Sequence, residues 1–232
     1  MQIKDSVVLV TGANRGLGLT LVHALITAGA RKVYAAARNP DSIQIPGVTA
    51  IKLDVTSPTD IAAAAEACGD VSILINNAGI LDHQGVHLLT EGSSGALNRE
   101  LATNVFGPLH LSQAFAPILA RNGGGAVLNI LSVLSWISVP GAATYSISKA
   151  AAWSMTNGLR HELQAQNTQV TGLHVAYMDT DMAHGVTGAK TSPQDVARQA
   201  LAALEAGQPE VLADDTSRQV RAGLSAEQAV YF

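Results

Sequence analysis

The chain has 232 residues, of which 47% are hydrophobic and only 14% are charged. This balance supplies a substantial core and excludes an intrinsically disordered chain. The 14 basic and 18 acidic residues give a net charge of −4, with none of the basic excess typical of nucleic-acid or membrane binding. A single cysteine, Cys68, excludes a disulfide scaffold and a cysteine-based zinc site, and it favours a reducing, cytoplasmic location.

Apolar, β-branched runs alternate along the chain with segments of helical periodicity. The expected strands are Ser6–Thr11, Lys32–Ala37, Val48–Leu53, Val71–Ile75, Ala126–Leu131, Gln169–Val175 and Glu210–Ala213. The expected helices are Leu17–Ala28, Pro58–Cys68, Leu101–Ala120, Tyr145–Gln164 and Pro193–Ala206. This alternation predicts an α/β fold, a doubly wound parallel sheet of about seven strands with helices on both faces. No repeat or linker interrupts the pattern, so we expect one domain over residues 1–232.

Two of the expected helices largely lack a charged face, Leu101–Ala120 throughout and Tyr145–Gln164 over its first part, Tyr145–Ser154. The uncharged stretches Leu101–Ala120 and Asn122–Ser148 are too polar to span a membrane. The two helices are therefore expected to be buried or to lie at a subunit contact. The sequence therefore predicts a homo-oligomer, a dimer or a tetramer, built on these helices. His83 and His87 lie four residues apart but lack a zinc motif, so we predict no metal site.

The first expected strand runs into a glycine-rich turn, Thr11-Gly12-Ala13-Asn14-Arg15-Gly16-Leu17-Gly18, which opens a helix. Glycines permit a tight turn and let a pyrophosphate approach backbone amides, and the helix N-terminus adds a positive dipole end. The spacing is Gly-x3-Gly-x-Gly, and it lacks the Gly-Lys-Ser/Thr ending of a P-loop. A plain strand–turn–helix corner has a similar pattern, but this context favours a nucleotide site.

The residues after the second strand indicate which nucleotide binds. An NAD site usually has an acid there, whereas an arginine accommodates the 2′-phosphate of NADP. Here the strand ends in Arg38 with no acid, and Arg15 lies within the glycine turn. We expect NADP(H), although both arginines also fit a description as solvated surface residues.

A second constellation consists of Tyr145 and Lys149, which lie one helical turn apart, and Ser132, which ends the fifth strand. A phenol titrates near ~10, and a nearby ammonium favours phenolate and lowers that pKa. The pair is thus a candidate proton donor with its tuning group, although a surface Tyr/Lys pair at this spacing is common. Ligands gather at the carboxyl ends of parallel strands, so Ser132 and the glycine turn are expected at the same edge.

Taken in order, these motifs resemble those of the single-domain short-chain dehydrogenase/reductase family, in particular its NADP(H)-dependent carbonyl reductases, from Val7 to about Ala213. The family's pattern appears as TGANRGLG at 11–18, Asp54-Val55, Asn76-Asn77-Ala78-Gly79, Asn104, Ser132 and Tyr145-x3-Lys149. The resemblance implies a Rossmann-type fold and a catalytic set of Asn104, Ser132, Tyr145 and Lys149. It implies cofactor contacts from Gly12, Asn14, Arg15, Gly16, Leu17, Gly18, Arg38, Asp54, Val55, Asn76, Ala78, Gly79, Tyr145, Lys149 and Thr180.

One segment departs from the family pattern. Val175 and Ala176 stand where the family has Pro-Gly before the threonine that matches Thr180, which puts the path of this loop in doubt. Between Ser132 and Tyr145, Trp136 is a candidate for lining the substrate pocket or for filling the core. Cys68 is expected to be a small packing residue rather than a nucleophile.

The resemblance implies hydride transfer between NADP(H) and a carbonyl or alcohol, as in a carbonyl reductase or alcohol dehydrogenase. No cluster of Arg or Lys is apparent near the expected pocket, which favours a small, neutral substrate. The alternative is a non-catalytic NADP(H)-sensing protein on the same fold. An enoyl reductase would space its Tyr and Lys more widely, and a sugar-nucleotide epimerase needs a longer chain.

Overall fold

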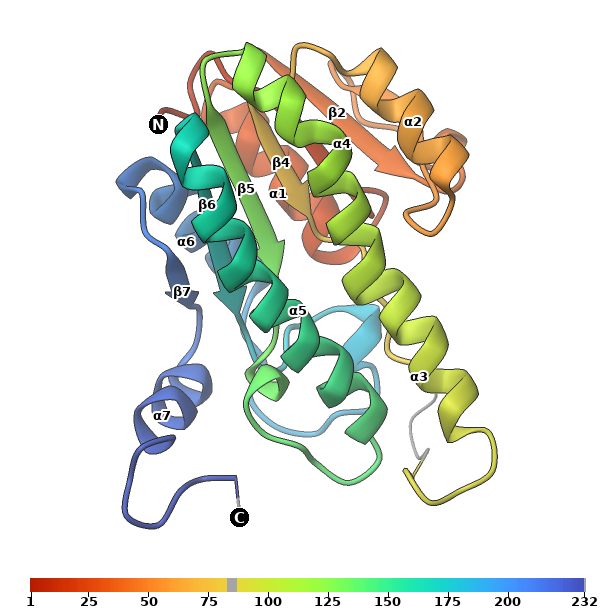
Figure 1. The fold of residues 1–232 in the computed structure, drawn as a ribbon, viewed down its shortest axis with the longest axis vertical. Coiled ribbons are helices and arrows are strands. Elements are labelled where there is room, and N and C mark those ends of the chain that lie inside the picture. The colour runs from red at the N-terminus through yellow and green to blue at the C-terminus, as the bar shows by residue number, and fades with distance from the viewer. Residues whose placement is uncertain (83–86, 232) are drawn as a thin grey trace.

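The computed structural model describes residues 1–82 and 87–231, and a parallel sheet lies at its centre (Figure 1). Seven strands pair in the order β3-β2-β1-β4-β5-β6-β7, all parallel. They are β1 (Val7–Thr11), β2 (Lys32–Ala37), β3 (Thr49–Lys52), β4 (Ile73–Asn76), β5 (Gly125–Ile130), β6 (Thr168–His174) and β7 (Glu210–Leu212). The predicted doubly wound sheet is confirmed, and every expected strand is present.

Helices cover both faces of the sheet (Figure 1). They are α1 (Gly16–Thr27), α2 (Pro58–Ala67), α3 (Ser93–Leu101), α4 (Gly107–Arg121), α5 (Ala143–Leu163), α6 (Pro193–Ala206) and α7 (Asp215–Gly223). One buried cluster joins α1 and α6 to the sheet, and a second joins α2, α4 and α5 to its other face. The second contains Cys68, whose thiol has its pKa raised to about 12 by burial, as expected of a packing residue.

The helix expected over Leu101–Ala120 is longer and less regular than the sequence indicates. It starts at Ser93, passes through a π-helical turn at Ala102–Phe106, and continues as α4 to Arg121. Pro108 has no N–H, so the carbonyl of Asn104 lacks the partner that an α-helix would supply four residues on. Gly107 permits close packing here, because a Cβ at this residue would lie 2.9 Å from Val55 Cγ2. The π turn therefore falls on a candidate catalytic residue, where such turns are frequent.

The last helix, α7, was not expected. Its nine residues are mostly polar and Val220 is their one large aliphatic side chain, so the apolar signal of a core-facing helix is weak. The helix instead depends on its N-cap, Asp214, whose carboxylate accepts a hydrogen bond of 2.7 Å from the Ser217 N–H.

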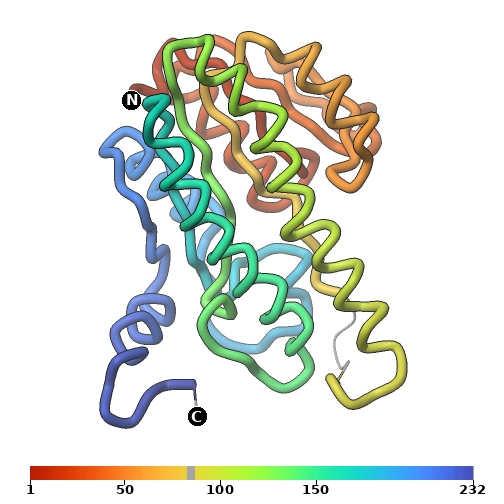
Figure 2. The backbone as a smooth tube through the Cα atoms, viewed as in Figure 1, coloured from red at the N-terminus to blue at the C-terminus, as the bar shows by residue number. Residues whose placement is uncertain are grey.

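The loops that follow β5 and β6 run together beyond the carboxyl edge of the sheet, away from the N-terminus of the chain (Figure 2). Two backbone hydrogen bonds extend the ladder there, from Leu131 N to Leu173 O at 2.7 Å and from Val133 N to Val175 O at 3.1 Å. Among the described residues, we find no helix with the length and apolar character needed to cross a bilayer.

Candidate active site

A cleft of about 1750 Å³ opens at the carboxyl edge of the sheet. It extends from Arg38 after β2, past the switch point between β1 and β4, to Tyr145 at the start of α5. Doubly wound sheets bind ligands at such a switch point. The site residues proposed from sequence that line this cleft are Gly12, Asn14, Arg15, Gly16, Leu17, Gly18, Arg38, Asp54, Val55, Ala78, Gly79, Ser132, Tyr145, Lys149 and Thr180.

The glycine turn is shaped by backbone that leaves no room for side chains. Gly12 and Gly16 have φ angles of 63° and 54°, in the left-handed region that favours glycine. At Gly18 a Cβ would lie 2.1 Å from the Gly12 carbonyl oxygen, so the first turn of α1 packs directly on the strand end. The turn thus exposes backbone at the mouth of α1, as a pyrophosphate site requires.

Asn77, a residue of the Asn76–Gly79 motif for which the sequence predicts no individual contact, holds this turn against the end of β4. Its side-chain amide donates to the carbonyls of Thr11 at 2.8 Å and Gly12 at 3.2 Å. In return, the Thr11 hydroxyl accepts from the N–H groups of Asn77 and Ala78, both at 3.0 Å. The signal was present in the sequence as the second Asn of the Asn76-Asn77 pair.

Asn76 lies under the cleft rather than in its lining. Its amide donates to Asn129 Oδ1 at 2.8 Å, and the Asn129 amide donates to the Thr156 hydroxyl at 2.9 Å. This buried chain of polar groups joins β4, β5 and α5, so Asn76 helps to seat the helix that carries Tyr145 and Lys149.

At the far end of the cleft, the two arginines expected to contact the cofactor are both exposed. Arg15 forms an ion pair of 3.1 Å with Asp181. Arg38 lies near Asp54, and hydrogen bonds from Thr56 together with the Arg38 charge lower the pKa of that carboxyl. Asn39 and Ser42, which follow Arg38, also line this end and were missed from sequence.

Lys149 is buried, with a relative exposure of 6%, and it has no carboxylate partner among the described residues. Its Nζ donates to the carbonyl oxygen of Ile130 at 2.8 Å and lies 5.6 Å from the centre of the Tyr145 ring. Burial lowers the pKa of Lys149 to about 8. The side chain therefore presents a poorly solvated ammonium to the cleft below that pH.

The structure corrects the expectation that Lys149 lowers the pKa of Tyr145. Burial raises the pKa of this phenol, the nearby Glu100 carboxyl raises it further, and only a hydrogen bond with Ser132 lowers it. Loss of hydration is the largest cause, and the Lys149 charge is not among the groups that offset it. Tyr145 is consequently a neutral phenol at neutral pH.

Asn104, in the π turn, lies behind Gly79 and holds the segment after β4. Its amide donates to the Ile80 carbonyl at 2.9 Å and to the Ser148 hydroxyl at 3.0 Å, and its Oδ1 accepts from the Ile80 N–H at 2.9 Å. A Cβ at Gly79 would lie 3.2 Å from this Oδ1 and 3.8 Å from Lys149 Nζ. Asn104 Oδ1 and Lys149 Nζ thus both approach Gly79 on the side where a Cβ would stand, which only glycine leaves open.

Ser132 is the second residue after β5 and caps a short 3₁₀ turn, where its hydroxyl accepts from the Leu134 N–H at 3.1 Å. Trp136, the candidate pocket residue, is not part of the cleft lining, and its place there is taken by Ile137 and Val139. Its ring stacks on His174 instead, with ring centres 3.8 Å apart. Whether Trp136 lines the cleft or packs in the interior depends on the direction of the turn after Ser132, and residue spacing does not define that direction.

The segment that lacks Pro-Gly has other anchors. The Ala176 N–H donates to Asp214 at 2.6 Å, and the Thr191 N–H donates to the Tyr177 carbonyl at 2.8 Å. Thr180 lies against Gly16, because a Cβ there would be 3.6 Å from Thr180 Cγ2. The threonine therefore reaches the glycine turn without the rigid proline.

The expectation of no basic cluster near the pocket is wrong for the cleft as a whole. Arg99, Lys190, Arg198 and Arg218 all line it. However, Arg99 pairs with Asp82, Arg198 with Asp195 at 3.1 Å, and Arg218 with Asp215 at 2.7 Å. Basic side chains brought in by α3, α6 and α7 are thus largely neutralised. Of the two histidines considered for a metal, His83 lies outside the described residues, so their separation is not defined.

The buried ammonium of Lys149 predicts a pH dependence of stability. The folded state holds this proton up to about pH 8, and the unfolded state holds it up to about 10.5. Between these values the unfolded chain binds more protons, so stability rises with pH, and the full burial penalty applies below pH 8. Relative to Lys149→Met, the wild type should gain about 3 kcal/mol from pH 7 to pH 10 in urea unfolding.

Taking the difference between wild type and variant cancels titrations common to both, including that of Cys68. Lys4→Met, at an exposed lysine, is the matched control and should show no such change. Parallel curves for wild type and Lys149→Met would contradict the burial of a charged group at this position.

Comparisons with known proteins agree with this geometry. A family model for short chain dehydrogenases matches residues 6–191. A short chain dehydrogenase from Burkholderia cenocepacia J2315, solved in complex with NADP, is 38% identical, with a TM-score of 0.93 over 98% of this chain and 95% of that one. A 3-ketoacyl-(acyl-carrier-protein) reductase from Brucella melitensis, solved with NADH, is 25% identical, with a TM-score of 0.83 over 91% and 97%.

Among curated proteins, the dehydrogenase/reductase SDR family member 7B of Bos taurus is 31% identical over 92% of this chain and 74% of its own length. The family match covers both the glycine turn and the Tyr145–Lys149 helix, the two parts that face each other across the cleft. The chain therefore belongs to the short chain dehydrogenase family of oxidoreductases, which use a nicotinamide cofactor.

Proposed function

We propose that residues 1–232 form one dinucleotide-binding and catalytic domain that transfers a hydride between NADP(H) and a small carbonyl or alcohol. The observation that carries this proposal is the placement of a neutral phenol, Tyr145, and a buried ammonium, Lys149, in the same cleft as the glycine turn. The similarity to a short chain dehydrogenase solved with NADP supports the choice of cofactor.

The cleft fits a dinucleotide on three counts. The glycine turn presents backbone without side chains to the cleft, because Gly12, Gly16 and Gly18 all line it. Arg15 and Arg38 at the far end supply cationic donors for a 2′-phosphate beside the Asp54 region. At the near end, Lys149 is a cation without a carboxylate partner among the described residues, and ribose hydroxyls are suitable acceptors for it.

When bound, the reduced nicotinamide supplies hydride to the carbonyl carbon of the substrate. Negative charge then grows on the carbonyl oxygen. Tyr145 donates its proton to that oxygen, and Ser132 stabilises it by a hydrogen bond. Because its pKa is raised, Tyr145 carries this proton at neutral pH and can donate it to the growing alkoxide.

Lys149 orients the nicotinamide ribose and keeps positive charge beside the site. Asn104 holds the Ile80 backbone beside Lys149. In this proposal, a water links Asn104 to Lys149 as part of a proton relay.

The substrate we propose is small and neutral. Three of the four basic side chains in this part of the cleft are paired with carboxylates, which offsets the positive charge that would attract an anionic substrate. Apolar residues line the region beside Tyr145, among them Ile137, Val139 and Val186. An apolar ketone or aldehyde fits this lining.

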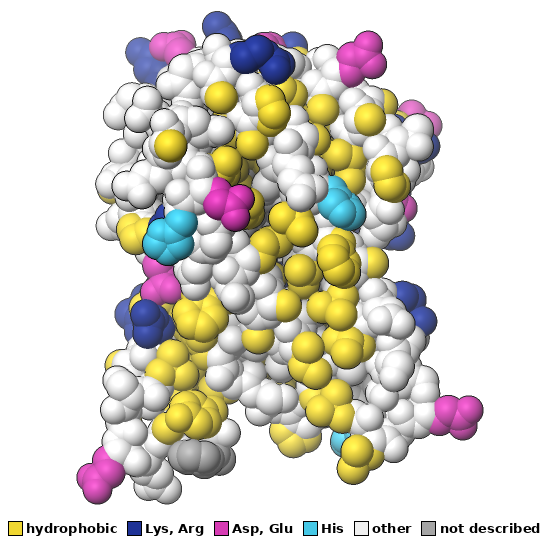
Figure 3. Space-filling model, viewed as in Figure 1, with side chains coloured by type: hydrophobic (Ala, Val, Ile, Leu, Met, Phe, Trp, Pro, Cys, Tyr) yellow, Lys and Arg dark blue, Asp and Glu magenta, His cyan; other side chains and the backbone are white. Residues whose placement is uncertain are grey.

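We further propose a homo-oligomer built on α4 and α5. Apolar side chains gather along the face of the molecule over these helices (Figure 3). Two of them are well exposed, Phe106 at 50% and Ile147 at 40%. A face of this kind is typical of a subunit contact. The single free cysteine is in keeping with a cytoplasmic location.

Replacing Tyr145 by Phe removes the proton donor and leaves the packing of the ring intact. We expect reduction of a panel of ketones and aldehydes, followed by NADPH absorbance, to fall at least about 10³-fold, because general acid catalysis is lost. Binding of NADPH should remain within a factor of about three, because the phenol makes a minor share of its contacts.

The control is Tyr34→Phe, which removes a buried hydroxyl from β2 and should keep activity. Retained activity in Tyr145→Phe would remove the proton-donor role. A wild type that binds NADPH tightly but reduces nothing in the panel would instead favour a non-catalytic NADP(H)-sensing protein.

Replacing Arg38 by Leu tests the cofactor choice. Loss of a charge-assisted contact with the 2′-phosphate should raise the KM for NADPH about 10- to 100-fold and leave the KM for NADH unchanged. The exposed Arg31, which lies at the opposite end of β2, is the matched control as Arg31→Leu. A wild-type enzyme that prefers NADH would contradict the assignment.

Light scattering after size exclusion tests the oligomer. The wild type should have the mass of a dimer or tetramer at micromolar concentration, and Phe106→Glu should lower that mass because it buries a charge in the contact. Ile26→Glu, at an exposed apolar residue of α1 on the other face, should leave the mass unchanged. A wild-type monomer would overturn the proposal.

A further inference from the structure

His174, the last residue of β6, is fully buried directly behind Ser132. Its Nδ1 lies 3.0 Å from the carbonyl oxygen of Ser132. A carbonyl oxygen only accepts hydrogen bonds, so the hydrogen of this contact belongs to Nδ1. The Ser132 carbonyl also accepts from the Ser135 N–H at 3.0 Å, and the imidazole therefore supplies its second bond.

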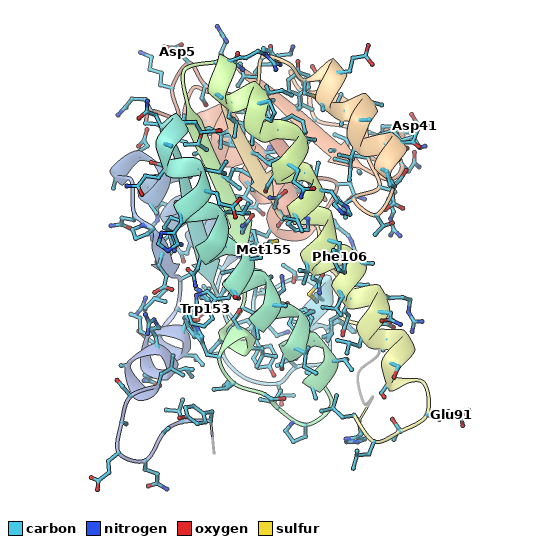
Figure 4. The ribbon with its side chains drawn as sticks, viewed as in Figure 1. Asp5, Asp41, Glu91, Phe106, Trp153 and Met155 are labelled. Atoms are coloured by element: carbon cyan, nitrogen blue, oxygen red, sulfur yellow. The ribbon has the colours of Figure 1, made fainter. Side chains whose placement is uncertain are left out.

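The imidazole stacks on one tryptophan, which in turn packs against a second. Trp136 stacks on it with ring centres 3.8 Å apart and planes at 17°. Trp153 of α5 then meets Trp136 edge-on, at 6.1 Å and 86°. In Figure 4, Trp153 extends from α5 toward the side of the molecule where β7 and α7 lie. The stacking thereby fixes the plane of the His174 ring, and the contact of Nδ1 with the Ser132 carbonyl sets which edge faces Ser132.

Charged groups from the C-terminal part of the chain complete this arrangement. Nε2 of His174 faces Glu210 Oε1 of β7 at 3.5 Å, and the other oxygen of Glu210 accepts from Arg221 of α7 at 3.2 Å. Contacts with His174 and Arg221 lower the pKa of Glu210, so the carboxylate stays ionised. Arg221 also lies 5.8 Å from the centre of the Trp136 ring, which joins both ends of the cluster.

This cluster lies at the point where the proposed reaction needs rigidity. Ser132 is beyond the last residue of β5, and His174 immediately precedes Val175, where the chain lacks the family's rigid proline. The Ser132 hydroxyl is placed by its backbone, since its one side-chain contact inside the turn is to the Leu134 N–H. Holding the Ser132 carbonyl fixes the peptide from which the hydroxyl projects, and the contact with the Leu134 N–H then sets the direction of the hydroxyl.

We propose that His174 is a positioning residue that fixes Ser132 from behind through the Nδ1–carbonyl hydrogen bond, with Glu210 and Arg221 holding the imidazole in place. The proposal rests on the proposed function, in which Ser132 contacts the substrate oxygen. It assigns to β7 and α7 a part in catalysis although neither supplies a catalytic residue.

Two substitutions of similar chemistry separate the two sides of the imidazole. In His174→Asn the amide nitrogen takes the place of Nδ1 and can still donate to Ser132. In His174→Gln the amide reaches the place of Nε2, toward Glu210, and the Ser132 bond is lost. Both remove the stacking on Trp136, so both should lower Tm to a similar extent.

At saturating NADPH, we expect kcat to fall about 10-fold or more in His174→Gln and to stay within about three-fold of wild type in His174→Asn, with KM for NADPH unchanged in both. A primary isotope effect from deuterated NADPH confirms that the hydride step is measured. Equal losses in both variants, no loss in His174→Gln, or a loss confined to the KM for NADPH would overturn the proposal.

A long-range ¹⁵N–¹H spectrum of the wild-type histidines gives a readout that needs neither activity nor a stable variant. The proposal requires a protonated Nδ1 at His174, assigned by the signal missing from either variant or by selective labelling. An unprotonated Nδ1 overturns it even if the enzyme is active. Conversely, an inactive wild type with a protonated Nδ1 refutes the proposed function and leaves the hydrogen bond to Ser132 standing.

Discussion

Because the strands are parallel, their carboxyl ends all lie at the same edge of the sheet. The backbone groups just beyond that edge need hydrogen-bond partners that no further strand supplies. Side chains meet this need. Asn77 bonds the carbonyls after β1, Asn104 bonds Ile80 after β4, and the Lys149 ammonium bonds the Ile130 carbonyl at the end of β5. The same polar side chains that complete the backbone bonding therefore shape the cleft.

This constraint explains why several site residues lie behind the cleft rather than in it. The oxygen and the nitrogen of the Asn104 side-chain amide both bond to the backbone of Ile80. Asn76 belongs to a buried chain of polar groups that reaches α5. Such residues act by holding loops in register. A small shift of a loop at a strand end moves a reacting group, and rates are sensitive to shifts of this size.

The electrostatics of the site also depend on enclosure. Tyr145 and Lys149 are both moved toward their neutral forms, the phenol by a raised pKa and the ammonium by a lowered one. Neither has an ionised partner within the described residues that offsets its loss of hydration. A site of this kind is prepared for an incoming polar ligand, which is where the proposed dinucleotide hydroxyls and substrate oxygen would lie.

The sequence alone determined the strands, because runs such as Val7–Thr11 are apolar throughout and suit a sheet covered on both faces. It also determined the glycine turn and the Tyr145–Lys149 pair, since both depend on short-range spacing. Only the tertiary structure decided the π turn at Asn104, helix α7, the role of Asn77 and the stacking of Trp136 on His174. The tertiary structure also decided that the pKa of Tyr145 is raised rather than lowered. Each of them depends on groups far apart along the chain, and on the water that their packing excludes, which local patterns do not record.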